Sequence, residues 1–104
     1  MGNLVRDRVP DIIRASGRTP HVMTLRPGEY RATLDVKLRE EVDELIAAQS
    51  TEAVIEEAAD IVEVLAAVAG TQGHTLENIV AVAERKCAAR GGFSMRLWLS
   101  GVDH

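Results

Sequence analysis

Apolar residues recur along most of this chain at the spacing of α-helices. Within residues 27–48, Leu34, Leu38, Val42 and Leu45 follow one another at intervals of four, four and three, so they lie on one helix face. A proline at position 27 suits the first turn of such a helix. The pattern then returns with a second set of apolar residues, which is Val54, Ala58, Ile61, Val62, Leu65 and Val68. The chain is therefore predicted to contain two long amphipathic helices.

Two further helices are predicted, one on each side of this pair. Residues 7–16 read as a short helix that Asp7 can cap. Residues 75–90 read as a longer one, with Thr75 as its N-cap and Gly91 as the residue that ends it. No segment shows a clear strand pattern.

The connections between these helices are short. The break at residues 49–51 allows only an antiparallel helix hairpin, and Ser50 or Thr51 can cap the helix that follows. Residues 18–26 are irregular, while residues 93–99 are apolar enough to pack against the helices. We therefore expect an all-α fold, a small helical bundle with a central antiparallel helix hairpin, as a single domain over residues 1–104.

Composition and charge exclude several classes of protein. A net charge of −4 with 3% aromatic residues is a poor profile for nucleic-acid binding, and no apolar run is long enough for a membrane span. The N-terminus lacks the apolar core of a signal peptide, and the single cysteine, Cys87, suits a reducing compartment. We expect a cytoplasmic protein. The small apolar residues also suit helix packing between chains, so a homodimer or higher homo-oligomer is expected.

The two long helices carry most of the chemistry. Acidic residues gather in one stretch of each, which is Glu40, Glu41, Asp43 and Glu44 on the first and Glu56, Glu57, Asp60 and Glu63 on the second. Carboxylates on helix surfaces ordinarily serve solubility. Glu41, however, falls between Leu38 and Leu45 on the apolar stripe. A carboxylate on a packed face is costly unless a cation or a metal compensates it.

The hairpin brings two acidic pairs together. Glu41 and Glu44 are three residues apart on one helix, as Glu57 and Asp60 are on the other, so each pair shares a helix face. The midpoint of the break puts both pairs at the same height. A site made only of oxygen ligands suits Mg²⁺ best, and Mn²⁺ next. A ferritin-like di-iron site would need Glu-x-x-His pairs, and no histidine stands three residues after an acid of these helices.

Several segments resemble the MazG-like all-α NTP pyrophosphohydrolase superfamily. The segments EEVDE at 40–44 and EAAD at 57–60 are similar to its EExxE…ExxD motif. The segments NLVRDRVP at 3–10, KLREE at 37–41 and KCAARGGF at 86–93 resemble its small phosphoribosyl-ATP pyrophosphohydrolase-like branch. The resemblance covers the chain nearly from end to end.

The resemblance implies hydrolysis of a nucleotide between its α- and β-phosphates, giving a monophosphate and pyrophosphate. It implies that Mg²⁺ is held by Glu41, Glu44, Glu57 and Asp60, and that Glu40 helps to orient the attacking water, so Glu40 and Glu41 are the expected catalytic residues. Cations are needed to hold the phosphates. The candidates are Arg6, Arg8, Lys37, Lys86 and Arg90, although Lys37 can instead serve as a counter-ion one turn before Glu41.

Three functions remain open at this point. The first is removal of non-standard or excess nucleoside triphosphates. The second is the phosphoribosyl-ATP pyrophosphatase reaction of histidine synthesis. The third, from a different class, is a non-catalytic helical module that binds a nucleotide without cleaving it.

Overall fold

Local capping explains where the helices begin and end. The computed structural model describes residues 2–104 and contains four helices in this part of the chain, which are α1 (Val9–Ala15), α2 (Pro27–Ala47), α3 (Thr51–Thr71) and α4 (Leu76–Arg90). The Ser50 hydroxyl accepts the Ala53 N–H at 3.1 Å, and Thr75 caps α4 in the same way through Asn78. Gly91 ends α4 with φ of 82°, a conformation that favours glycine. The all-α prediction is confirmed.

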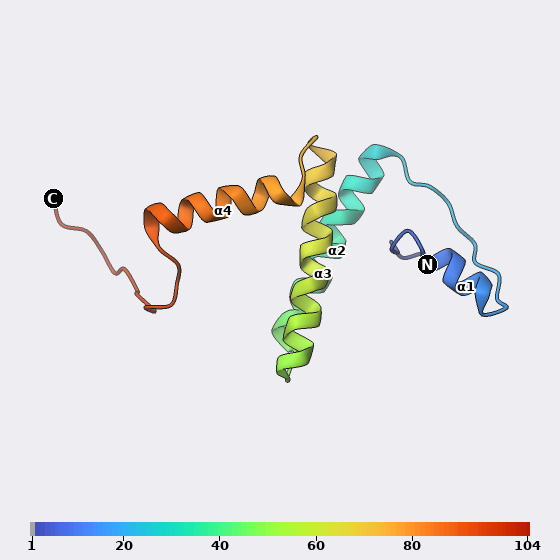
Figure 1. The fold of residues 1–104 in the computed structure, drawn as a ribbon, viewed down its shortest axis with the longest axis horizontal. Coiled ribbons are helices and arrows are strands. Elements are labelled where there is room, and N and C mark those ends of the chain that lie inside the picture. Colours follow the sequence, from blue (N-terminus) through green and yellow to red (C-terminus); the bar gives the residue numbers. More distant parts are fainter. Residues whose placement is uncertain (1) are drawn as a thin grey trace.

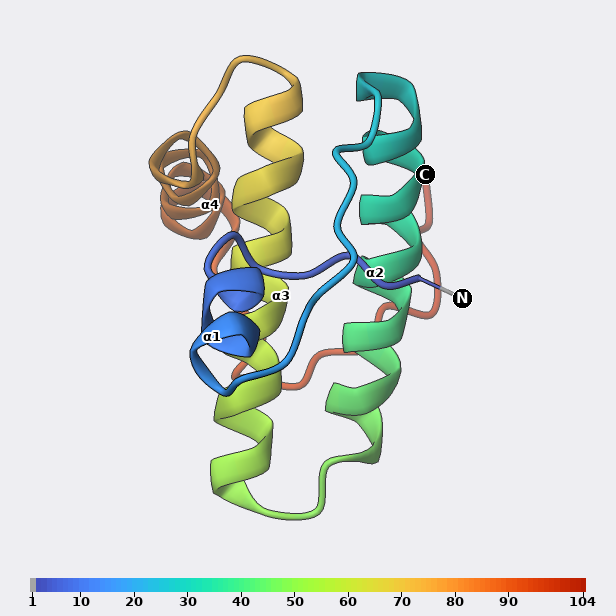
Figure 2. The same ribbon diagram turned by 90° about the vertical axis from the view of Figure 1, so that its right-hand side faces the viewer.

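Helices α2 and α3 form the predicted antiparallel hairpin. They lie side by side over most of their length and are joined by the short break after Ala47 (Figures 1 and 2). Leu34 from α2 and Val64 from α3 are buried between the helices, with exposed fractions of 2% and 7%. These two side chains belong to a small core, because only Ala69 and Glu41 join them among the buried residues of the described chain. The hairpin carries the acidic residues that the sequence singled out.

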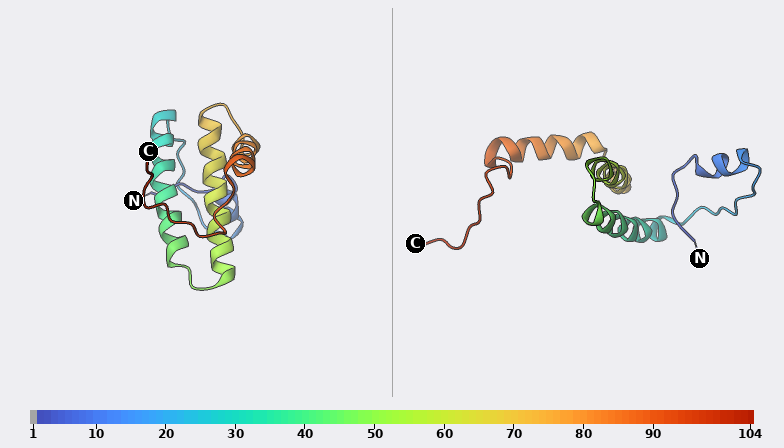
Figure 3. Two further views of the ribbon diagram at one scale, coloured as in Figure 1. Left: turned by 90° about the vertical axis from the view of Figure 1, so that its left-hand side faces the viewer. Right: turned by 90° about the horizontal axis from the view of Figure 1, so that it is seen from below.

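The other elements surround the hairpin loosely. Helix α4 packs against the end of α3 and then projects away from it, whereas α1 lies on the opposite side of the hairpin (Figure 3). The N-terminal segment 2–8 runs across the hairpin before α1 begins (Figure 2). Within the described residues, no helix is both long enough and apolar enough to cross a membrane.

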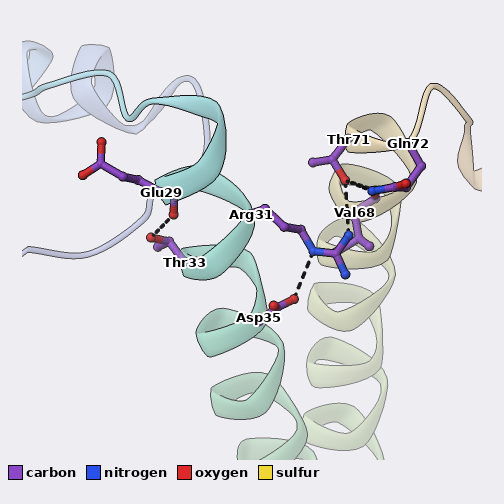
Figure 4. Close-up of polar contacts among 7 residues, drawn as sticks. All are labelled: Glu29, Arg31, Thr33, Asp35, Val68, Thr71 and Gln72. Carbon is purple, nitrogen blue, oxygen red and sulfur yellow. Dashed lines mark hydrogen bonds and ion pairs between the residues drawn. The ribbon is translucent and has the colours of Figure 1, made fainter.

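Arg31 helps to fix the register of the two hairpin helices. Its guanidinium donates to Asp35 Oδ1 at 3.2 Å on its own helix and reaches Thr71 Oγ1 on α3 at 3.5 Å (Figure 4). Thr71 in turn donates to the carbonyl of Val68 at 2.6 Å. These contacts lie at the end of the hairpin opposite the break. The helices are thus aligned at both ends, which sets the heights of the acidic residues between them.

Two local predictions are wrong. Arg8, not Asp7, occupies the N-cap of α1, and it makes no capping hydrogen bond through its side chain. Residues 93–99 do not pack against the helices of the chain, since Phe93 is 98% exposed and Trp98 is 91% exposed. The positive φ of Gly91 turns this segment away from the hairpin (Figure 1).

Candidate metal centre

Glu41 lies inside the hairpin. It follows Leu34 by seven residues on α2, so the same face that buries Leu34 also turns this carboxylate toward α3. Glu41 is 6% exposed and is the buried charged residue of the described chain. Lys37, one turn earlier, places its Nζ 3.5 Å from Glu41 Oε1. One ammonium group therefore compensates part of a charge that the fold has removed from water.

Glu41 belongs to a group of three carboxylates. Glu41 and Glu44 from α2 and Glu57 from α3 each offer an oxygen, and these oxygens lie within 4.8 Å of one another. Opposite ligands of an octahedral Mg²⁺ are about 4.2 Å apart, so the group is close to the size that such an ion needs. Glu44 and Glu57 approach each other across the hairpin, as the position of the break between the two helices predicted.

Crowding of these carboxylates changes the acidity of Glu57. A proton-sharing contact with Glu44 is the main cause, followed by loss of hydration and by repulsion from Glu44, and contacts with Glu41 and Asp60 add to it. Together they raise the pKa of Glu57 from 4.5 to about 7. The cluster holds a proton near neutral pH when no cation neutralises it.

Two buried oxygens of the cluster are suited to binding a cation. Glu41 Oε2 and Glu57 Oε2 are almost inaccessible to solvent and have no hydrogen-bond partner among the described residues. An unpaired buried carboxylate oxygen is costly, and a divalent ion bound by oxygen ligands would satisfy both atoms. With Glu44, these residues provide a donor set of carboxylates alone, which suits a hard cation.

Asp60 stands outside this group of three. Its Oδ1 lies 2.6 Å from Arg6 Nη2, and the second guanidinium nitrogen lies 3.8 Å from Glu63 Oε2. The arginine arrives from the N-terminal segment, far from α3 in sequence. Asp60 is therefore neutralised by an ion pair, while the other three expected ligands are brought together.

A cleft of about 490 Å³ opens beside these acids. The N-terminal segment forms one wall, and residues of α2 and α3 form the rest. Arg6, Lys37, Glu41 and Asp60 all line it, so two of the expected phosphate-binding cations face two of the expected metal ligands. Glu63 also lines the cleft, and it was not among the expected ligands although it extends the spacing of Glu57 and Asp60 by one more turn. Tyr30, equally unassigned, gave no sequence signal.

The remaining expected residues lie elsewhere in the chain. Glu40 is exposed on α2, next to Glu41 but outside both the cluster and the cleft. Arg8 is exposed at the start of α1. Lys86 lines a separate groove between α3 and α4, and Arg90 is the exposed last residue of α4. Within one chain, α4 contributes no residue to the acidic cleft.

The helical hairpin with its carboxylates defines a class, the MazG-like all-α nucleotide pyrophosphohydrolases. Within this class, the sequence profile of the phosphoribosyl-ATP pyrophosphohydrolase family matches residues 11–87, and the chain belongs to that family. The matched region contains the four expected metal ligands and Lys86. Arg6, Arg8 and Arg90 lie outside it.

One relative comes from Mycolicibacterium smegmatis (strain ATCC 700084 / mc(2)155), where it is described as an uncharacterized protein. The two sequences are 59% identical over 56 residues, which is 54% of this chain and 57% of the relative. The chain thus aligns with little more than half of that protein's length. No solved structure matches the chain significantly.

Proposed function

We propose that this protein is a divalent-metal-dependent nucleotide pyrophosphohydrolase that cleaves the bond between the α- and β-phosphates. The observation that carries the proposal is the group formed by Glu41, Glu44 and Glu57, with two buried oxygens that lack a partner. Membership of a pyrophosphohydrolase family supports this use of the group. Mg²⁺ is the proposed ion, with Mn²⁺ as a substitute.

Asp60 is the proposed fourth ligand. Its ion pair with Arg6 is half-exposed, and such pairs contribute only about 0–1 kcal/mol, so a divalent cation can displace the arginine. Arg6 lines the same cleft and is then free to hold a phosphate of the substrate. Lys37 keeps Glu41 oriented and offsets its charge.

When bound, the metal neutralises phosphate charge and lowers the pKa of a water molecule. The residues of the chain place the α-phosphate in the cleft and accept the proton as water attacks. The new oxygen bond forms at the α-phosphorus, the bond to the bridging oxygen breaks, and pyrophosphate leaves. Glu40, which adjoins Glu41 on α2, is proposed to orient the attacking water.

Two substrate classes remain as candidates. Removal of non-standard or excess nucleoside triphosphates requires only the reaction described above. The description of the matching family favours phosphoribosyl-ATP and hence a step of histidine synthesis. We keep the first as the broader proposal, with a cytoplasmic location.

The test is product release from a panel of standard and modified nucleoside triphosphates together with phosphoribosyl-ATP. We expect equal amounts of pyrophosphate and monophosphate with Mg²⁺ and none with EDTA. Glu41→Gln should lower turnover at least ~100-fold, because it removes charge from a metal ligand, whereas Glu56→Gln, on the same helix as Glu57 but outside the cluster, should not. A preference of about tenfold or more for phosphoribosyl-ATP would assign that substrate.

A folded protein that binds nucleotide and Mg²⁺ but releases no product from any member of the panel would contradict catalysis. It would favour the non-catalytic binding module instead. Wild-type turnover in Glu41→Gln would contradict the assignment of the metal ligands while leaving the reaction itself in place.

A further inference from the structure

Arg6 fastens the N-terminal segment 2–8 to the hairpin. The segment crosses the hairpin and forms one wall of the acidic cleft (Figure 2). In the part of the chain that the structure describes, its backbone forms hydrogen bonds with Val9 and Ile12 of α1 and none with α2 or α3. The ion pairs of Arg6 with α3 are therefore the polar contacts that hold this wall of the cleft in place.

The two partners of Arg6 differ in what else they can bind. Asp60 Oδ1 lies 2.6 Å from Nη2 of the arginine, and Glu63 Oε2 lies 3.8 Å from Nη1. The two acids are three residues apart on α3, so they share a helix face. Asp60 is the proposed fourth metal ligand, whereas Glu63 is 63% exposed and stands outside the group of three carboxylates. A cation that binds Asp60 thus takes one partner from Arg6 and leaves the other.

Glu63 lies where Arg6 can still reach a phosphate. It is about 4.5 Å further along the axis of α3 than Asp60, which is one turn of the helix. Lys37 lies one turn before Glu41 on α2, so the antiparallel hairpin puts Lys37 and Glu63 at the same height, and both line the cleft. An arginine held by Glu63 therefore shares this height with Lys37, directly beside the metal centre.

We propose that Glu63 is a positioning residue that keeps Arg6, and with it the N-terminal segment, over the cleft when a divalent cation occupies Asp60. This inference rests on the metal site of the proposed function. In the metal-free protein Arg6 pairs mainly with Asp60, and in the metal-bound protein it pairs with Glu63. A guanidinium group has five N–H donors in a planar fork, so it can bind Glu63 and a substrate phosphate at the same time.

The first test uses Mg²⁺ without nucleotide, and trypsin as a probe of the segment. Trypsin cleaves after Arg6 only when this side chain has left its partners, and cleavage after Arg96, an exposed residue outside the cleft, is the internal reference. In EDTA, wild-type protein and Glu63→Gln should be cleaved at similar rates, since Asp60 still holds Arg6. With saturating Mg²⁺, Glu63→Gln should be cleaved about threefold faster than wild type, because Arg6 then has neither partner.

Two controls accompany this test. Glu56→Gln makes the same substitution on α3 outside the cluster and the cleft, and should be cleaved like wild-type protein. Calorimetry should show that Glu63→Gln changes the affinity for Mg²⁺ by less than about fivefold, because an exposed ion pair contributes little. A larger loss, of about tenfold or more, would make Glu63 a metal ligand and would overturn the positioning role.

The second test is a double-mutant cycle on turnover. Glu63→Gln should raise the KM for nucleotide about two- to fivefold and leave kcat unchanged, because Arg6 is held less often at the phosphate. In the Arg6→Ala background the same substitution should raise KM no further, since the residue that Glu63 positions is gone. An equal rise of KM in both backgrounds would show that Glu63 acts on the substrate without Arg6, which contradicts the proposal.

The outcomes separate this inference from the proposed function. Equal cleavage after Arg6 in wild-type protein and Glu63→Gln at saturating Mg²⁺ would overturn the positioning role and leave the reaction in place. Mg²⁺-dependent cleavage of Glu63→Gln without turnover of any nucleotide would support the positioning role and contradict catalysis. A protein that binds no Mg²⁺ would overturn both.

Discussion

The carboxylate of Glu41 lies in the hairpin beside those of Glu44 and Glu57, and Lys37 offsets only part of the negative charge. Such a group is electrostatically unfavourable by itself, which is why Glu57 retains a proton to an unusually high pH. The same crowding prepares the site for a divalent cation. At the scale of single residues, repulsion in the metal-free protein and affinity for a metal have one cause.

The raised pKa of Glu57 predicts a specific pH dependence of stability. Its pKa is about 7 in the folded protein against 4.5 as the ordinary value, so between these values the folded state binds more protons than the unfolded state. The stabilising contribution of Glu57 to the free energy of unfolding is therefore fully present below pH 4.5 and is lost as pH rises through about 7. Denaturant unfolding in EDTA should show this decline in wild-type protein relative to Glu57→Gln.

The affinity for a metal ion should change with pH in the opposite direction to the stability. A proton on Glu57 competes with the cation, so the affinity for Mg²⁺ should rise with pH up to about 7 and then level off. Calorimetry in buffers of different ionisation enthalpy would measure the proton released at pH 6. Equal affinities below and above pH 7 would contradict a role for Glu57 as a ligand.

Arg6 gives a second prediction at this scale. Arg6→Ala removes the competitor for Asp60, so Mg²⁺ should bind about two- to fivefold more tightly, in line with a half-exposed ion pair. The KM for nucleotide should rise, because the proposed phosphate contact is lost. Arg14→Ala is a suitable control, since Arg14 pairs with Asp11 on α1, away from the cleft. A weaker Mg²⁺ affinity in Arg6→Ala would show that the arginine supports the metal site rather than competing with it.

At the scale of elements, the hairpin holds the site through few buried side chains. Leu34 on α2 and Val64 on α3 are among the few buried apolar side chains, and Arg31 on α2 reaches Thr71 on α3 at the end opposite the break. Because both helices present acids at i and i+3, the register of the hairpin alone decides which carboxylates meet. A shift by one turn would separate Glu44 from Glu57.

Leu34→Ala tests this dependence on the hairpin. Leu34 is 2% exposed, so its truncation should lower the free energy of unfolding by about 2–5 kcal/mol. Val36→Ala, two residues away on the exposed face, should change it by less than about 0.5 kcal/mol. Chemical denaturation of both variants measures the difference. Equal effects would mean that α2 is not buried on the face that the structure shows.

At the scale of the whole molecule, the described chain is extended and its hydrophobic core is small. The hairpin stands between α1 on one side and, on the other, α4 with the residues that follow it (Figure 3). The stability of such a chain depends strongly on whatever binds its folded state. One such contribution is proposed, a divalent cation in the acidic cluster.

Mg²⁺ should accordingly raise the melting temperature of the protein. A ligand that binds only the folded state adds about 2.7 kcal/mol at a concentration of 100 times its Kd. Glu41→Gln should abolish the rise without lowering the melting temperature in EDTA, because it removes one of the mutually repelling charges. Scanning calorimetry with and without Mg²⁺ measures both. A melting temperature that is indifferent to Mg²⁺ at millimolar concentration would count against a preformed site.

Periodicity and capping, both local properties, determined the helices and most of the acidic cluster. The stripe through Leu34 and Leu38 already directed Glu41 inward, and the short break at Ser50 imposed the hairpin that brings Glu44 to Glu57. Tertiary structure alone decided that Arg6 reaches Asp60, that α4 carries Lys86 away from the acids, and that residues 93–99 stay exposed. These outcomes depend on how flexible connections direct distant segments and on which surfaces remain uncovered, and neither follows from the spacing of residues along one helix.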